Sequence, residues 1–163
     1  MSQISANEGP KLEQIDLTNL NLQQLTQLKQ NLDQELGVFQ DSLQALKIAQ
    51  NKFQESGTSL GKINPRAKGK EILVPLTSSM YVTGKLANTE TVIVDIGTGY
   101  YAEKDIQGAK DYFTRRVNYV TEQMEKIQQI GLEKSRIREA IREVMEMKMQ
   151  EQRAAMKESS EHS

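Results

Sequence analysis

The chain contains no cysteine and no tryptophan, and only 5% of its 163 residues are aromatic. Without cysteine, neither a disulfide framework nor a thiolate metal site can form. Hydrophobic residues make up 37% of the chain and charged residues 26%. This is little apolar material for a compact core, but it suits long helices that each bury one narrow stripe.

The sequence also lacks long apolar runs and an excess of one charge. The formal net charge is −1, so no strong overall field attracts nucleic acid or an anionic membrane. No run reaches the roughly 18 apolar residues of a membrane-spanning helix. The start, "MSQISANEGP", has neither the basic nor the apolar region of a signal peptide. We therefore expect a soluble protein of the cytoplasm, with the nucleus as a further location, and neither nucleic acid nor a membrane as partner.

The first predicted helix occupies residues 16–62. Asn21 and Gln24 have the three-residue spacing of a capping box, and Leu20 and Leu25 flank it at the hydrophobic-staple positions. Spacings of three and four residues then alternate, which is the narrow a/d seam of a coiled coil. The residues on this seam are Leu36, Phe39, Leu43, Leu46, Gln50, Phe53, Gly57 and Leu60.

The second predicted helix occupies residues 105–153, with Asp105 as its N-cap. Its seam begins with Phe113, Val117, Val120, Met124 and Ile127. After these residues we interpret the pattern as a three-residue skip, with the seam resuming at Ile130, Ile137, Ile141 and Val144 and with Lys134 as a weak spot. Two seams of similar length on either side of a chain reversal predict an antiparallel coiled coil within the chain.

Residues 70–104 form a β insert between the two helices. We predict strands at 71–77, 79–86, 91–96 and 100–104, paired as two hairpins. Apolar residues fall on both faces, and two short hairpins cannot bury two faces or protect their own edges in water. The insert is therefore predicted to complete a sheet or barrel with other chains. The predicted oligomerisation residues are Ile72, Leu73, Val74, Leu76, Met80, Val82, Val92, Ile93, Val94, Ile96 and Tyr100.

The two ends of the chain have weak patterns. We expect residues 1–15 to form a flexible tail and residues 154–163 a disordered one, which leaves a single domain at 16–153.

Motifs for catalysis or for binding a cofactor or metal are missing. The sequence has no catalytic triad, and its only histidine, His162, lies in the C-terminal tail. The Gly-Thr-Gly of "DIGTGYY" is not followed by the Gly-Lys-Ser/Thr of a phosphate-binding loop, so a hairpin turn is the better interpretation. We expect no enzyme activity and no cofactor.

The β insert resembles a known family. "EILVPLTSSMYVTGKL" followed by "NTETVIVDIGTGYYAEKD", set between two coiled-coil helices, resembles the α-type subunits of prefoldin, most closely the eukaryotic ones. The helical stretch "LDQELGVFQDSLQALKIAQNKFQES" resembles them as well. The resemblance covers roughly residues 15–153, and the hairpin segment is its specific part, because coiled-coil helices match many proteins.

The resemblance implies a hexameric chaperone of two α-type and four β-type subunits, which in eukaryotes are different proteins. In that architecture each α-type subunit supplies two hairpins to a double β-barrel, from which six coiled coils project. Their distal ends hold unfolded actin, tubulin and similar clients without ATP and deliver them to the cytosolic chaperonin. The implied partners are thus the other α- and β-type subunits, unfolded actin and tubulin, and the chaperonin.

Apolar residues near the two ends of the chain are the candidates for client binding, if the seam leaves them unpaired. Three methionines fall within residues 145–149, and at that spacing they face more than one side of a helix. Flexible thioether side chains suit contacts with many partners. The alternative, that these residues fill the end of the seam, is equally open. The candidates are Leu17, Leu20, Leu22, Leu25, Val144, Met145, Met147, Met149 and Met156.

Two other functions fit a coiled coil. The chain could be a tethering or scaffold subunit of another complex, which would bind one folded partner tightly instead of many unfolded ones. A membrane-surface helix is disfavoured because charges of both signs mix on the polar faces.

Overall fold

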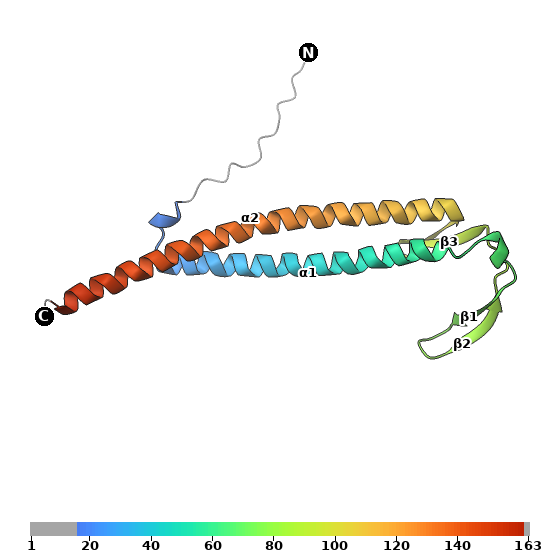
Figure 1. Ribbon diagram of the computed structural model, residues 1–163, viewed down its shortest axis with the longest axis horizontal. Helices are drawn as coiled ribbons and strands as arrows, with labels where there is room; N and C mark the ends of the chain where they lie inside the picture. The colour runs from blue at the N-terminus through green and yellow to red at the C-terminus, as the bar shows by residue number, and fades with distance from the viewer. Residues whose placement is uncertain (1–15, 162–163) are drawn as a thin grey trace, which may run out of the picture. The chain divides into compact units, whose positions relative to one another are not determined.

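The structure, a computed structural model, describes residues 16–161. It consists of two long helices with two β-hairpins between them (Figure 1), which confirms the predicted fold class. The predicted tail at 1–15 and the histidine at 162 lie outside the described residues. In chain order the elements are η1 (Leu17–Asn19), α1 (Leu22–Leu60), η2 (Pro65–Ala67), β1 (Glu71–Pro75), β2 (Tyr81–Lys85), β3 (Thr91–Gly97), β4 (Tyr100–Asp105) and α2 (Ile106–Glu161).

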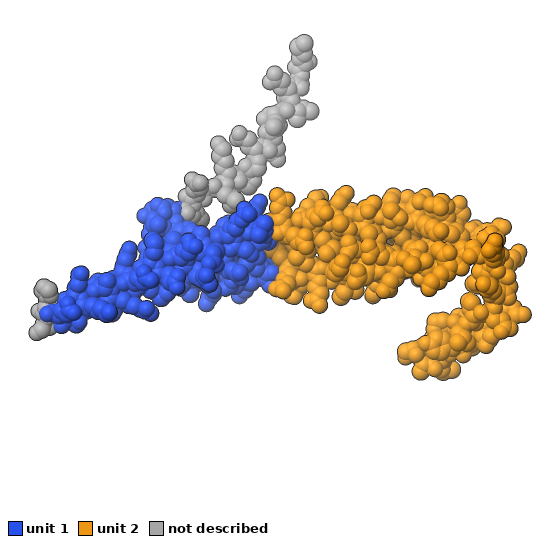
Figure 2. Space-filling model, viewed as in Figure 1, with its two compact units in different colours: residues 1–38, 131–163 blue, residues 39–130 orange. Residues whose placement is uncertain are grey.

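The chain divides into two compact units (Figure 2). Unit 1 comprises Met1–Val38 and Gly131–Ser163, and unit 2 comprises Phe39–Ile130. Within each unit a part of α1 lies beside a part of α2 that runs in the opposite direction (Figure 1). The hairpins belong to unit 2, and both ends of the chain belong to unit 1.

The starts of both long helices are capped as predicted. The backbone N–H of Gln24 donates to Asn21 Oδ1 at 2.8 Å, and the N–H of Asn21 donates to Gln24 Oε1 at 3.1 Å, which completes the capping box. At α2, Gly108 donates its N–H to Asp105 Oδ1 at 2.8 Å. A Cβ at Gly108 would lie 2.5 Å from that oxygen, so a side chain there would displace the cap.

The α1 seam has the predicted phase, since every predicted position from Leu36 to Leu60 is buried or half-buried. The α2 seam differs from the prediction. Ile130 and Ile137 are each 44% exposed, whereas Gly131, Lys134 and Arg138 are half-buried. A series of buried and half-buried positions keeps the 4-3 spacing along α2 without a skip, at 113, 117, 120, 124, 127, 131, 134, 138, 141, 145 and 148.

The unbroken phase of α2 has a physical reason. A skip would change which side of the helix faces its partner, and α2 is one continuous helix whose geometry fixes the facing positions. The polar side chains that fall on the seam are paired across it. Lys134 Nζ lies 2.6 Å from Glu35 Oε2, and Arg138 lies 3.2 Å from Asp33 Oδ1. In this part of α2 the geometry of the helix therefore decides which positions face α1, and ion pairs with α1 accommodate the charged side chains at those positions.

The core of unit 2 lies where the hairpin of β3 and β4 packs on the helices. Leu60, Val94 and Ala109 are buried together. The Phe53 and Phe113 rings pack across the helix pair with centroids 6.3 Å apart. Further along the seam, Gln50 donates from Nε2 to Thr121 Oγ1 at 2.8 Å, so this buried amide is hydrogen-bonded. The partly buried residues around the core are Ile63, Val92, Ile106, Tyr112 and Phe113.

The four strands form two separate two-stranded antiparallel sheets, β1 with β2 and β3 with β4. In the first sheet Val74 is paired with Val82. In the second, a bulge between Asp95 and Gly97 precedes a turn in which Gly97, Thr98 and Gly99 all have positive φ. This conformation favours glycine, so the Gly-Thr-Gly motif forms the predicted hairpin turn.

The end of α2 differs from the prediction of a disordered tail at 154–163. The helix continues to Glu161, and every residue from Glu151 to Glu161 is exposed. Residues 150–158 are Gln, Glu, Arg, Ala, Met and Lys, all strong helix formers, and no glycine or proline interrupts them. Helix propensity thus extends α2 beyond the last residue that packs on α1.

Candidate interaction surfaces

The hairpin of β1 and β2 exposes apolar side chains on both faces. Cross-strand pairing places Ile72 and Val74 on one face with Val82, and Leu73 on the other. Leu73 is 69% exposed, and the remaining predicted residues of this hairpin are also exposed. An isolated two-stranded sheet with two apolar faces is at best marginally stable in water, so this hairpin has the character of an incomplete interface.

The hairpin of β3 and β4 has one covered face. Ile93 is 74% exposed, whereas its neighbour Val94 is buried against Leu60 and Ala109. The prediction that Val94 serves oligomerisation therefore needs correction, because its side chain packs on the chain's own helices, and Val92 is half-buried beside it. Ile93, Ile96 and Tyr100 remain available on this hairpin's surface.

Two tyrosines of the hairpins were absent from the predicted set. Tyr81 is 56% exposed and Tyr101 is 65% exposed. Tyr81 is paired with Pro75 on the same face as Leu73, and Tyr101 is paired with Asp95 on the same face as Ile93. Side chains alternate between the two faces along a strand, so residues two apart share a face. Counting in steps of two along each strand could therefore have placed both tyrosines on these apolar faces.

A groove of about 900 Å³ runs beside β3 in unit 2. Six consecutive β3 residues, 92–97, line it, and no β4 residue does, so β3 presents its unpaired edge to the groove. Phe53 and Leu60 of α1 also line the groove. The guanidinium of Arg116, which also lines the groove, lies 5.3 Å from the centre of the Phe53 ring in a cation–π contact.

The apolar candidates near the two chain ends are mostly packed together in unit 1. Leu25 and Ile141 are fully buried, and with Leu32 they form this unit's core. Leu17, Leu20, Val144 and Met145 are partly buried against that core, and Leu22 is half-buried. For Leu25 the structure therefore favours the alternative that the residue fills the end of the seam, because Leu25 is a core residue. The other candidates of this group are only half-buried.

The last methionines of α2 are different. Met147, Met149 and Met156 are 53%, 39% and 70% exposed. They lie on the part of α2 where the seam ends, so apolar and polarizable surface faces solvent there.

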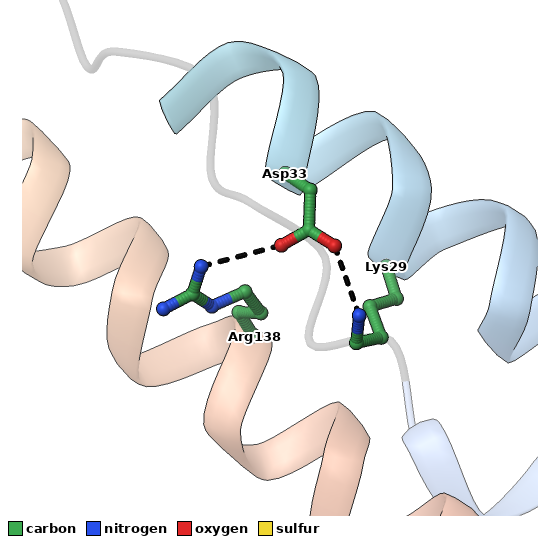
Figure 3. A network of polar contacts seen from close by, with 3 residues as sticks. All are labelled: Lys29, Asp33 and Arg138. Atoms are coloured by element: carbon green, nitrogen blue, oxygen red, sulfur yellow. Dashed lines mark hydrogen bonds and ion pairs between the residues drawn. The ribbon is translucent and has the colours of Figure 1, made fainter. Parts of the chain in front are cut away.

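A polar network in unit 1 joins the two helices (Figure 3). Asp33 accepts from Lys29 Nζ at 2.9 Å and from an Arg138 nitrogen at 3.2 Å. The hydrogen bond from Lys29, and then that from Arg138, hold the pKa of Asp33 below its ordinary value of 3.8. A lowered carboxyl pKa adds stability above pH 3.8 and loses it only as the pH falls through the folded-state value, so the network is intact at neutral pH. Ion pairs this accessible to solvent contribute little stability and mainly fix how the helices align.

Within residues 16–161, no group of three or more histidine, aspartate and glutamate side chains is arranged to hold a metal ion. Neither long helix combines the length with the apolar run that crossing a bilayer needs.

The comparison with protein families gives a match over most of the chain. Residues 32–151 match the family described as prefoldin subunit. The chain belongs to the prefoldin family. It is a subunit of the prefoldin co-chaperone complex, with other prefoldin subunits as its partners.

Three curated relatives carry the same subunit name. The chain is 51% identical over 138 residues to probable prefoldin subunit 5 of Drosophila melanogaster, covering 85% of this chain and 82% of the relative. It is 48% identical over 139 residues to prefoldin subunit 5 of Homo sapiens, covering 85% and 90%. It is 32% identical over 140 residues to prefoldin subunit 5 of Arabidopsis thaliana, covering 86% and 93%.

Among solved structures, a similar chain occurs in the cryo-EM structure of filamentous PFD from Methanocaldococcus jannaschii. It has 21% sequence identity and a TM-score of 0.45, and the match covers 75% of this chain and 96% of that one.

Proposed function

We propose that this prefoldin subunit assembles through its hairpins and captures unfolded polypeptides with the surface at the end of α2. The hairpins would close a β-barrel with sister subunits, since both faces of the β1–β2 hairpin are apolar and exposed. Capture would need no ATP, because binding through apolar surface is driven by the burial of that surface.

The proposal also names the client proteins and the chaperonin that receives them. By the likeness to prefoldin subunits 5, the clients would include unfolded actin and tubulin, and the complex would pass them to the cytosolic chaperonin. We place the subunit in the cytoplasm, with residues 16–153 as its working domain. The proposal assigns the chain no enzyme activity and no nucleic-acid or membrane partner.

One observation carries the proposal of client capture, namely the exposure of Met147, Met149 and Met156. Flexible thioether side chains can adapt to apolar segments of different sequence, which a protein with many unfolded clients requires. A tether that binds one folded partner would instead favour a rigid, shape-complementary surface.

Replacing the three exposed methionines tests client capture. The variant with Met147→Ser, Met149→Ser and Met156→Ser should still enter the complex but suppress aggregation of denatured actin about tenfold less well, because apolar contact area is lost. The measurement is light scattering of diluted, denatured actin with increasing complex. A control with Gln150→Ser, Gln152→Ser and Glu158→Ser should keep full activity. Full activity in the methionine variant would reject α2 as a client-binding surface.

A further inference from the structure

The turn that precedes α1 is closed by its own side chains. Asp16 Oδ1 accepts from the backbone N–H of Thr18 at 3.0 Å and from its hydroxyl at 2.6 Å. Asp16 Oδ2 accepts from Asn19 Nδ2 at 3.2 Å. The Thr18 hydroxyl, and then its backbone N–H, lower the pKa of Asp16, so the carboxylate that holds the turn is charged at neutral pH. We call Asp16–Leu20 the N-terminal turn.

The N-terminal turn folds back onto the helix pair of unit 1. Leu17 and Leu20 are half-buried against the core of Leu25, Leu32 and Ile141. Lys148 Nζ, on α2, donates to the carbonyl oxygen of Thr18 at 2.8 Å. The turn is thus held by two leucines three residues apart and by one hydrogen bond to its backbone.

The contacts on the receiving side are not specific to this segment of chain. Val144 and Met145 belong to the same partly buried group as the turn's leucines. Methionine adapts to apolar groups of different shape, and Lys148 reaches a backbone carbonyl, which every polypeptide has. Lys148 also attracts the Asp16 carboxylate. A short turn with an acidic side chain and two aliphatic side chains three residues apart therefore offers the same groups.

We infer that the surface of Val144, Met145 and Lys148 beside the core of unit 1 is a binding site for short apolar turns of other polypeptides, and that the N-terminal turn occupies it as a self-ligand. The inference rests on the proposed capture of unfolded chains and adds where and what the subunit binds. An incoming segment with two aliphatic residues at i and i+3 would replace Leu17 and Leu20 and take over the bond from Lys148. The self-ligand would cover the site until such a segment arrives and so restrict binding to segments that outcompete it.

Emptying the site tests the inference directly. The variant with Leu17→Ser and Leu20→Ser leaves every receiving residue in place. The probe is an end-blocked peptide that copies residues 16–20, "DLTNL". The readout is the NMR signal of the Met145 methyl group in the assembled complex. We expect the peptide to shift this signal in the emptied variant at a concentration at least about tenfold lower than in the unsubstituted complex, because no self-ligand competes.

Matched controls distinguish binding at this site from nonspecific apolar binding. A peptide with both leucines replaced by serine should shift nothing. Adding Lys148→Met to the emptied variant should weaken peptide binding severalfold, whereas adding Lys157→Met, at an exposed position further along α2, should not. Asp16→Ala, which loosens the turn but keeps its leucines, should give an intermediate response and covers the case in which the double variant folds poorly.

The outcomes distinguish this inference from the proposed function. Equal titrations of the emptied and unsubstituted complexes, or an equal response to the serine peptide, would overturn the self-ligand. If the peptide binds as expected but denatured actin is not held, the site stands and client capture fails. If actin is held equally well by the emptied and unsubstituted complexes and the peptide does not discriminate between them, client capture stands and the self-ligand fails.

Discussion

Replacing Leu73 by lysine is expected to exclude the subunit from the prefoldin complex. Leu73 is 69% exposed on the face of the β1–β2 hairpin that it shares with Tyr81. If a sister subunit covers that face, a lysine would be buried there without a partner, and an unpaired buried charge costs several kcal/mol. Because about 1.4 kcal/mol corresponds to a factor of ten in affinity, we expect at least a tenfold loss of assembled subunit.

Co-expression with the sister subunits and sizing of the purified complex measures this loss. The matched control is Ile48→Lys, at a 51% exposed apolar position of α1, which should assemble normally. Val94→Lys would not serve as the test, because Val94 is in the core of unit 2 and its substitution would unfold the surroundings of the hairpin. Normal assembly of the Leu73→Lys subunit would show that this face of the hairpin stays in water.

Ile141→Ala is expected to destabilise unit 1 strongly, and Ile137→Ala hardly at all. Ile141 is fully buried, and removing a buried isoleucine side chain costs about 2–5 kcal/mol. Ile137 is 44% exposed, and substitutions at such surface positions usually change stability by about 0.5 kcal/mol or less. The two residues are one helical turn apart on α2, so the pair tests the phase of the seam.

Hydrogen exchange of the α2 segment in unit 1 resolves the difference. For Ile141→Ala we expect exchange of residues 131–150 to accelerate roughly thirtyfold or more, which corresponds to about 2 kcal/mol. For Ile137→Ala exchange should stay within a fewfold of the unsubstituted protein. Similar acceleration in both variants would mean that the seam resumes after a skip.

The exposure of Ile137 and the half-burial of Lys134 show where prediction of the seam from the sequence fails. The 4-3 repeat up to Ile127 predicts the α2 seam correctly, because apolar side chains occupy each facing position there. Beyond it, isoleucines at 130 and 137 suggest a new phase, although helix geometry continues the old one through Gly131, Lys134 and Arg138. The polar partners Asp33 and Glu35 lie about 100 residues away along the chain, so local pattern could not identify them.

The strands illustrate a similar limit. Composition and turn residues predict all four strands and both hairpins, because β-branched runs between short turns of serine, threonine and glycine are a strong local signal. Alternation separates the two faces of β3 but does not say which one the chain's own helices cover. Val94 is buried and Ile93 exposed only because Leu60 and Ala109 meet that particular face. Such contacts depend on tertiary packing that residue patterns do not contain.

The candidate binding site was predicted in part. Sequence reasoning identified the apolar residues of both helix ends but could not foresee that Leu17 and Leu20 fold back onto the core of unit 1. The signal that closes the turn, an aspartate followed two residues later by a threonine, was present in "DLT". Its docking on α2 through Lys148 links positions 130 residues apart and required the structure.

Hydrogen exchange of the assembled complex tests the central claim most directly, that sister subunits complete the β1–β2 hairpin. Residues 154–161, which are all exposed at the end of α2, provide a fast internal reference, and residues 91–105 provide a packed one. The account predicts that residues 71–85 exchange as slowly as residues 91–105, because neighbouring strands would protect both edges of the hairpin. Exchange of residues 71–85 as fast as that of residues 154–161 would contradict it.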